Sequence, residues 1–162
     1  MAIDKVRGYL KNWGRDVDIL EFDASSATVE MASMALGVEA NRIAKTLSFK
    51  AGEAAMLVVD AGDTKIDNSK FKGEFGMKAK MLSPEEVIEY TGHAVGGVCP
   101  FGLTLDIPVY CDVSMKRFET VFPACGSSNS AIELTCDELE EYSNMIRWVD
   151  VCKGWQEQDN IE

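Results

Sequence analysis

The segment Gly96 to Gly102 has the residue types of a loop that could hold a ligand through its backbone. Its seven residues, Gly-Gly-Val-Cys-Pro-Phe-Gly, include three glycines and one proline. Glycine allows positive φ angles and close approach to a ligand, while proline fixes the shape of the loop. Such a loop can direct backbone N–H groups at a carbonyl oxygen or a phosphate. It matches neither a P-loop nor a dinucleotide fingerprint, and a purely structural turn is the alternative interpretation.

Lys45 is a second candidate, because it is a cation among apolar residues in the run Ile43-Ala44-Lys45-Thr46-Leu47. A lysine in this setting can simply extend its ammonium group to solvent. It can also direct one positive charge into a pocket, where a phosphate is its natural partner. The pattern alone leaves both interpretations open.

Two other sets of polar residues have simpler explanations. Cys99 could be a nucleophile with His93 six residues earlier, but closeness in sequence does not establish contact, and a buried inert thiol explains it equally. The run Gly126 to Ser130 is typical of a tight turn and could also add hydroxyl and amide groups to a pocket rim. With one histidine and no G-x-S-x-G, the chain has no Ser-His-Asp triad.

The elements expected to position these residues are short helices and strands in irregular alternation. Periodicity and capping signals predict helices over residues 4–13, from Ser25 or Ser26 to 36, and over 67–76, 83–90 and 135–142. They predict strands over 19–22, 45–49, 56–60, 77–82, 109–113, 131–134 and 148–151. This order predicts one α+β domain, residues 1–155, with a curved mixed or antiparallel, barrel-like sheet surrounded by helices, followed by a polar tail at 156–162.

Composition narrows the class of protein. The 162 residues, 46% of them hydrophobic, suit one domain with its own core. No apolar run reaches the ~18 residues of a membrane span, and no signal-peptide pattern is visible. The five cysteines are odd in number and widely spaced, and there is a single histidine. We therefore expect a cytoplasmic protein with reduced thiols and with neither a metal nor a cofactor.

The charge distribution limits the contacts with nucleic acid. A net charge of −11 counts against broad binding along a polyanion but allows contact with a short end of one. Residues 65–80 hold five lysines and two acids, whereas residues 133–162 hold nine acids and two basic residues. Solvated surfaces explain both segments, and a small basic face that orients a polyanion is the alternative.

Three of these segments together resemble the YbaK family, which is related to the editing domain inserted in bacterial prolyl-tRNA synthetase. The resemblance rests on RIAKTL at 42–47, on TGHAVGGVCPFG at 91–102, and on AIEL at 131–134 before an acidic helix. In element order it extends from about Phe22 to Val151. It implies a free-standing trans-editing enzyme that hydrolyses the ester joining a wrong amino acid, such as alanine or cysteine, to the 3′ end of proline tRNA.

The resemblance also implies roles for residues. Lys45 would hold the terminal adenosine through its phosphate, and the G-x-x-x-P loop would bind the substrate carbonyl and the developing oxyanion. Water would be activated largely by the free ribose hydroxyl of the substrate, without a protein nucleophile. The catalytic residues predicted on this basis are Lys45, Gly96, Gly97, Val98, Cys99 and Pro100. The predicted substrate-binding residues are Thr46, His93, Phe101, Gly126, Ser127, Ser128 and Asn129.

Two other functions are compatible with the sequence. The first is a binding module of the same fold that captures an aminoacyl-tRNA 3′ end or a protein partner without hydrolysis, which the net charge of −11 favours. The second is a thiol enzyme that uses Cys99 and His93. The expected partners are the tRNA acceptor end and an aminoacyl-tRNA synthetase, with no membrane. No apolar heptad or exposed apolar run indicates an oligomer, so we expect a monomer.

Overall fold

The computed structural model describes residues 2–155, and within that range the chain forms five α-helices, four 3₁₀-helices and ten strands. The α-helices are α1 (Ala2–Leu10), α2 (Val29–Leu36), α3 (Asn68–Phe75), α4 (Pro84–Thr91) and α5 (Cys136–Ser143). The strands are β1 (Leu20–Glu21), β2 (Ile43–Ala51), β3 (Ala54–Ala61), β4 (Lys65–Ile66), β5 (Val109–Asp112), β6 (Thr120–Pro123), β7 (Ser130–Ala131), β8 (Leu134–Thr135), β9 (Arg147–Val149) and β10 (Cys152–Lys153). The 3₁₀-helices are η1 (Lys11–Trp13), η2 (Asp16–Asp18), η3 (Ala40–Arg42) and η4 (Val113–Arg117).

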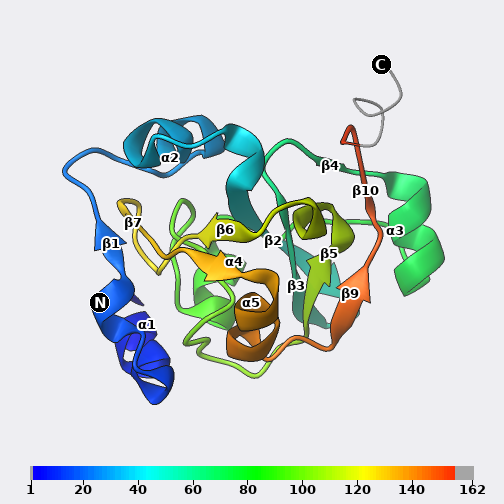
Figure 1. Cartoon of the computed structure of the whole chain (residues 1–162). Coiled ribbons are helices and arrows are strands. Elements are labelled where there is room, and N and C mark those ends of the chain that lie inside the picture. The colour runs from blue at the N-terminus through cyan, green and yellow to red at the C-terminus, as the bar shows by residue number, and fades with distance from the viewer. Residues whose placement is uncertain (1, 156–162) are drawn as a thin grey trace, which may run out of the picture.

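Six of the strands form one curled, mixed sheet in the order β8-β6-β2-β3-β5-β9. The β2–β3 and β6–β8 pairs are antiparallel, while β2–β6, β3–β5 and β5–β9 are parallel. Helices α1 and α2 lie on one side of the molecule and α3 on the opposite side (Figure 1). The prediction of an α+β fold with a curved mixed sheet surrounded by helices is therefore confirmed.

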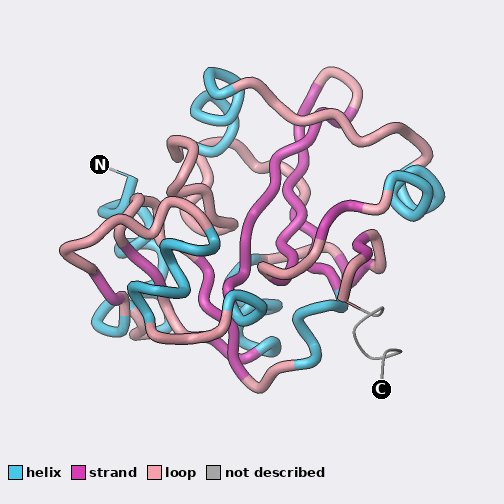
Figure 2. Tube along the Cα trace, turned by 90° about the horizontal axis from the view of Figure 1, so that it is seen from above, coloured by secondary structure: helices cyan, strands magenta, loops and turns pink. Residues whose placement is uncertain are grey.

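The long β2–β3 hairpin is the central element of this sheet. Its ladder runs from Ala44 opposite Ala61 to Ala51 opposite Ala54, and Gly52 reverses the chain with a φ of 64°. Figure 2 shows the two strands twisting about one another across the molecule. The sequence predicted this hairpin, and the structure extends both of its strands.

Strand β3 is covered on both of its faces, because the hairpin lies between two apolar clusters. Leu57 and Val59 belong to the main core, whereas Val58 packs with Phe49 and Phe71 in a second cluster below α3. The rings of Phe49 and Phe71 are 4.9 Å apart between centroids. Every residue of β3 after Ala54 is buried as a result, including the polar ones.

Local signals correctly located several helices. Ser83 and Thr135 each begin a helix with a capping box, as expected, and Asp67 caps α3. Helix α2 begins later than predicted, because the Thr28 hydroxyl, rather than Ser25 or Ser26, accepts the capping bond from Met31 N–H at 3.1 Å. None of the helices within residues 2–155 has the length and apolar character needed to cross a membrane.

Some strand predictions were wrong. Residues 77–82 do not form a strand and make a single bridge between Met81 and Phe49. The strand expected over 131–134 is divided between β7, which pairs with β1, and β8, which pairs with β6. Strand β6 was not predicted, and the predicted tail at 156–162 lies outside the described residues.

Candidate active site

A cavity of about 270 Å³ lies between β2, the beginning of α2, the beginning of α4 and the glycine loop. Its wall is formed by Ser26–Val29 and Ala32, by Ile43–Ser48, by Met81, Leu82, Pro84 and Val87, by Val95, Gly96 and Val98, and by Phe122, Ala124, Ser130 and Ala131. Most of these side chains are apolar, and Lys45 is the one charged residue among the described residues of the wall. The cavity therefore combines an apolar enclosure with a single cation.

Lys45 reaches the cavity from β2, and its ammonium group is held from the side of β3. It donates to the carbonyl oxygen of Thr64 and lies 3.8 Å from Oδ2 of Asp60, its direct partner in the ladder. The Lys45 side chain is 24% exposed, whereas that of Asp60 is completely buried. An ammonium group has three hydrogens to donate, so the one bond to Thr64 leaves donors for an anion in the cavity.

The glycine loop turns sharply and presents backbone N–H groups. The N–H of Gly97 donates to the Ala94 carbonyl at 3.0 Å, and Gly96 within this turn has a φ of 97°. Glycine adopts this conformation readily and other residues do not. Among the described residues, the N–H groups of Gly96, Val98 and Cys99 have no acceptor. Cys99 is completely buried and the N–H of Gly97 is committed to the turn, so the donors left for a ligand are the N–H groups of Gly96 and Val98.

Four of the residues predicted from the sequence line the cavity. Lys45 and Thr46 come from β2, and Gly96 and Val98 come from the glycine loop. The Thr46 hydroxyl is buried and has no hydrogen-bond partner in the described part of the chain. Pro100 borders a different hollow, of about 290 Å³. The loop thus contributes only part of the G-x-x-x-P segment to the cavity wall.

His93, Cys99 and Phe101 lie behind the loop and are completely buried. Nε2 of His93 is 2.8 Å from the Phe101 carbonyl oxygen. Because that oxygen only accepts, Nε2 carries the hydrogen. Burial lowers the pKa of His93 and raises the pKa of the Cys99 thiol to about 12. The side chains of His93 and Phe101, which were predicted to bind substrate, thus lie in the interior and do not line the cavity.

The turn over residues 126–129 also lies behind the cavity wall. Oγ of Ser127 is 3.0 Å from Oδ1 of Asn129 and 2.6 Å from Oγ of Ser130, and Nδ2 of Asn129 donates to the Phe22 carbonyl at 2.8 Å. These bonds tie the turn to the segment that leads into α2. Gly126, Ser127, Ser128 and Asn129 do not line the cavity, whereas Ser130, which was not predicted, does.

The beginning of α2 is the largest part of the wall that was not predicted. Residues 26–29 and Ala32 close the cavity opposite β2. These residues are small or apolar and carry no chemistry that a motif would mark. Their position depends on the ties between residues 22–26 and the turn at 126–130, which connect segments about a hundred residues apart.

The chain belongs to the aminoacyl-tRNA editing domain family, whose model matches residues 23–142. This finding confirms the resemblance to the YbaK family that residues 42–47 and 91–102 carry.

The chain is also similar to individual proteins. The uncharacterized protein YwhH of Bacillus subtilis (strain 168) is 58% identical over 157 residues, which are 96% of this chain and 100% of the relative. The proline–tRNA ligase of Shouchella clausii is 32% identical over 104 residues, which are 64% of this chain and only 18% of the ligase. A solved structure described as a candidate trans-editing enzyme for prolyl tRNA synthetase has a TM-score of 0.85 and 30% identity, covering 94% of this chain and 98% of that one.

Proposed function

We propose that this protein hydrolyses the ester between a small mischarged amino acid, such as alanine or cysteine, and the 3′ end of proline tRNA. One observation carries the proposal: one cavity is lined by Lys45 and by two loop residues, Gly96 and Val98, whose N–H groups have no acceptor within residues 2–155. A cation and two N–H donors match the phosphate of the terminal nucleotide and the oxyanion that forms when water adds to the ester carbonyl.

The chemistry follows from these two features. Lys45 holds the phosphate and thereby places the ester carbonyl at the loop. Water adds to the carbonyl carbon, the N–H groups of Gly96 and Val98 stabilise the tetrahedral oxyanion, and the bond to the ribose oxygen breaks with that oxygen taking a proton. One such donor is worth about 3 kcal/mol of barrier. The free ribose hydroxyl of the substrate relays the proton, accepting one from the attacking water and giving its own to the leaving ribose oxygen, since His93 and Cys99 are buried behind the loop.

The wall of the cavity favours a small amino acid. Ala27, Ala32 and Ala131 contribute small side chains, and most of the remaining wall is apolar. A volume of about 270 Å³ is at the small end of ligand pockets. We therefore expect an alanyl or cysteinyl ester to be bound in preference to a large or charged one.

The direct experiment is deacylation of proline tRNA charged separately with alanine, cysteine, serine and proline. We expect release of alanine or cysteine, with the prolyl ester spared. If the tRNA binds saturably and no ester is lost, the protein is a binding module of this fold. If all esters are released equally, the assigned specificity is wrong.

The role of Lys45 has a matched control on the same strand. Lys45→Met should lower kcat/KM by about 100-fold, because a charged contact to the phosphate is lost. Lys50 also lies on β2, and its ammonium is 3.8 Å from Glu86, outside the cavity wall. Lys50→Met should leave kcat/KM unchanged. Equal effects of the two substitutions would contradict the role given to Lys45.

We also propose a contact with an aminoacyl-tRNA synthetase. The net charge of −11 opposes extended contact with tRNA, so a synthetase that holds the rest of the tRNA would compensate. Adding prolyl-tRNA synthetase to the deacylation assay should lower KM for the charged tRNA. An unchanged KM would contradict this contact without affecting the proposed hydrolysis.

A further inference from the structure

Asp60 is a completely buried acid that faces Lys45, the cation of the cavity wall as the described residues form it. It is the direct ladder partner of Lys45, whose ammonium group is 3.8 Å from its Oδ2. No other acidic side chain within residues 2–155 forms an ion pair with Lys45. The protonation state of Asp60 therefore decides how much of the charge on Lys45 is compensated inside the protein.

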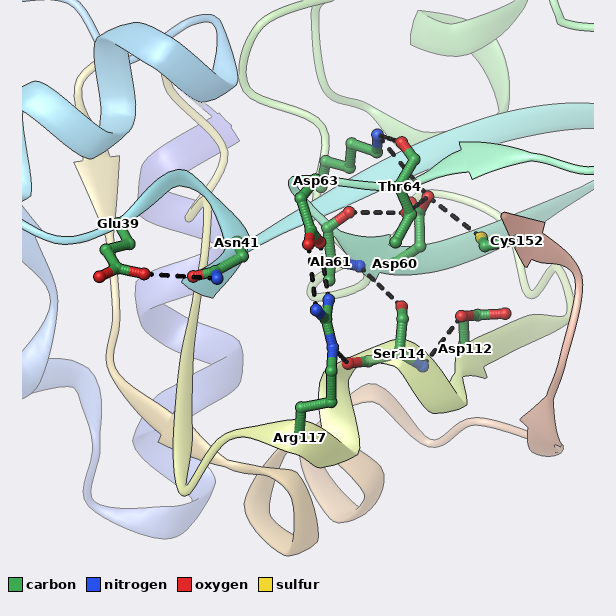
Figure 3. Close-up of polar contacts among 11 residues, drawn as sticks. Glu39, Asn41, Asp60, Ala61, Asp63, Thr64, Asp112, Ser114, Arg117 and Cys152 are labelled. Atoms are coloured by element: carbon green, nitrogen blue, oxygen red, sulfur yellow. Dashed lines mark hydrogen bonds and ion pairs between the residues drawn. The ribbon is translucent and has the colours of Figure 1, made fainter. Parts of the chain in front are cut away.

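The hydrogen bonds around Asp60 fit a carboxyl group that carries a proton. Oγ1 of Thr64 is 2.8 Å from Oδ2 of Asp60 and 2.7 Å from the Ala61 carbonyl oxygen. Figure 3 draws the polar contacts among these three residues. A hydroxyl group has one hydrogen to donate, and a carbonyl oxygen only accepts. When the Thr64 hydroxyl donates to Ala61, the contact with Asp60 requires a hydrogen on the carboxyl group, which then donates to Thr64.

The second carboxyl oxygen of Asp60 also indicates a protonated carboxyl group. Oδ1 of Asp60 is buried and has no hydrogen-bond partner among the described residues. An unpaired charged oxygen in an apolar interior costs far more than an unpaired neutral one. The neighbouring Asp112 differs, because its Oδ2 accepts from Ser114 N–H at 3.0 Å and its Oδ1 from Val151 N–H at 2.8 Å. Both carboxyl oxygens of Asp112 thus accept hydrogen bonds from backbone N–H groups, whereas Oδ1 of Asp60 accepts none among the described residues.

The groups around Asp60 set the range in which it changes charge. The titratable groups that face it from the strands packed against it are Lys45 of β2, Asp112 of β5 and Cys152 of β10, whose Sγ donates to Oδ2 at 3.4 Å. Asp63 accepts two hydrogen bonds from Arg117, at 2.6 and 3.0 Å, so the charges of these two residues neutralise each other. Burial raises the pKa of Asp60 to about 7, against the opposing effect of Lys45 and with a smaller upward effect of Asp112.

We propose that Asp60 is a positioning residue whose proton decides how strongly Lys45 binds the phosphate of a substrate. With the proton in place, the ammonium group is held by the Thr64 carbonyl and its charge is directed to the cavity. Without the proton, the carboxylate competes with the phosphate for the same ammonium group. The inference rests on the proposed function, which assigns Lys45 to the phosphate. It requires that substrate binding and protonation of Asp60 favour each other.

The first test measures binding of a probe that resists hydrolysis, proline tRNA carrying alanine through a 3′-amide bond, at pH values on either side of the pKa of Asp60. The Kd of the wild type should rise about tenfold from the lower to the higher pH, and that of Asp60→Asn by less than about twofold, because an amide does not ionise. Asp106→Asn changes an exposed acid outside the cavity wall and should follow the wild type.

Two results would overturn the inference. Asp60→Asn could show the same rise in Kd as the wild type, which would mean that another group titrates. It could instead weaken binding equally at both pH values, which would make Asp60 a permanent anionic anchor for Lys45. Thermal unfolding of Asp60→Asn shows whether the variant is folded before either result is interpreted.

The second test follows the carboxyl carbon of Asp60 by NMR, identified by its loss in Asp60→Asn. The midpoint of titration should lie near neutrality, move upward in Lys45→Met, and move upward when the probe binds the wild type. A midpoint near the ordinary value of 3.8 in a protein that binds the probe would contradict this inference alone. Failure of the wild type to bind the probe at any pH would contradict the proposed function, and the role of Asp60 with it.

Discussion

Gly97 lies against the backbone of Ser127 so closely that a Cβ atom on Gly97 would be 2.9 Å from both the N and the C atoms of Ser127. The glycine loop and the turn at residues 126–130 are therefore in direct backbone contact. This contact joins the segment that presents the N–H groups to the segment that anchors the entrance of α2. The position of the glycine loop therefore depends on the position of the turn at residues 126–130, and the reverse also holds.

Gly97→Ala should displace the glycine loop and impair deacylation. The added methyl group meets backbone, which cannot move aside as a flexible side chain can. A displacement of about 1 Å at a reacting centre can cost about 100-fold in rate, and we expect a loss of kcat of that order.

Gly73→Ala is the matched control, since an added Cβ at this position in α3 meets nothing within 4 Å. It should raise Tm slightly, because alanine favours a helix over glycine by about 1 kcal/mol, and leave kcat unchanged. Equal kcat for Gly97→Ala and the wild type would show that the position of the loop is not critical.

Cys99→Ala should retain deacylase activity. The thiol is completely buried, its pKa is raised to about 12 by burial, and Nε2 of His93, 3.5 Å away, already donates to the Phe101 carbonyl. The substitution should lower stability by about 1 kcal/mol through the small cavity that it creates. Deacylation rates and Tm measured together distinguish the two effects, and loss of activity in a fully folded variant would restore the thiol-enzyme hypothesis.

The free energy of unfolding should depend on pH through Asp60. Its pKa is 3.8 as an ordinary aspartate and about 7 in the folded chain, where burial favours the neutral acid. Between these two pKa values the folded state therefore keeps a proton that the unfolded state releases. The stabilisation of the folded state is fully present below pH 3.8 and is lost as the pH rises through about 7. The upper limit of this loss is about 4 kcal/mol.

The free energy of unfolding of Asp60→Asn should lack this dependence on pH. Its Tm relative to the wild type should increase as pH rises between the two pKa values, while the Tm of Asp106→Asn relative to the wild type should stay constant. Thermal unfolding at several pH values measures both differences. A constant difference for Asp60→Asn would mean that Asp60 is ionised throughout.

The lysines of residues 65–80 provide a test of the basic-face hypothesis. Lys70 is already paired with Asp150 at 3.0 Å, whereas Lys72 and Lys78 are exposed. Reversing the charges of Lys72 and Lys78 together should raise KM for charged tRNA about threefold at low salt. The salt dependence of KM should decrease and kcat should stay unchanged. Lys11→Glu, on η1, is the control. An unchanged KM in the double variant would rule out this face as a tRNA contact.

Elements specified by local signals could be predicted from the sequence. The capping residues Ser83 and Thr135 begin helices where expected, and the strands predicted on either side of Gly52 pair as a hairpin. Strand β6 and the division of residues 131–134 between two sheets could not be predicted, because these strands are short and their pairing depends on partners far away in the sequence.

The candidate site was predictable where residue types are unusual. A lysine among apolar residues and a glycine-proline loop stand out, and Lys45, Gly96 and Val98 do line the cavity. Asp60 did not stand out, because one acid in a hairpin strand looks like an exposed polar residue until both faces of β3 are known to be covered. The burial of His93 and Phe101 likewise follows from long-range packing that the motif does not encode.

Helix α1 contributes no residue to the cavity wall, yet it supports that wall from outside. A Cβ atom on Gly126 would be 3.0 Å from the backbone of Ala2, and one on Gly102 would be 3.2 Å from the carbonyl oxygen of Lys5. Both glycines belong to the loops behind the site, whereas the match to the family model begins only at residue 23. A fragment limited to residues 23–142 would keep every residue of the cavity wall. It would lose the backbone of α1, against which the loops that contain Gly102 and Gly126 pack. The unit that must be expressed to study this site is thus larger than the segment by which the family is recognised.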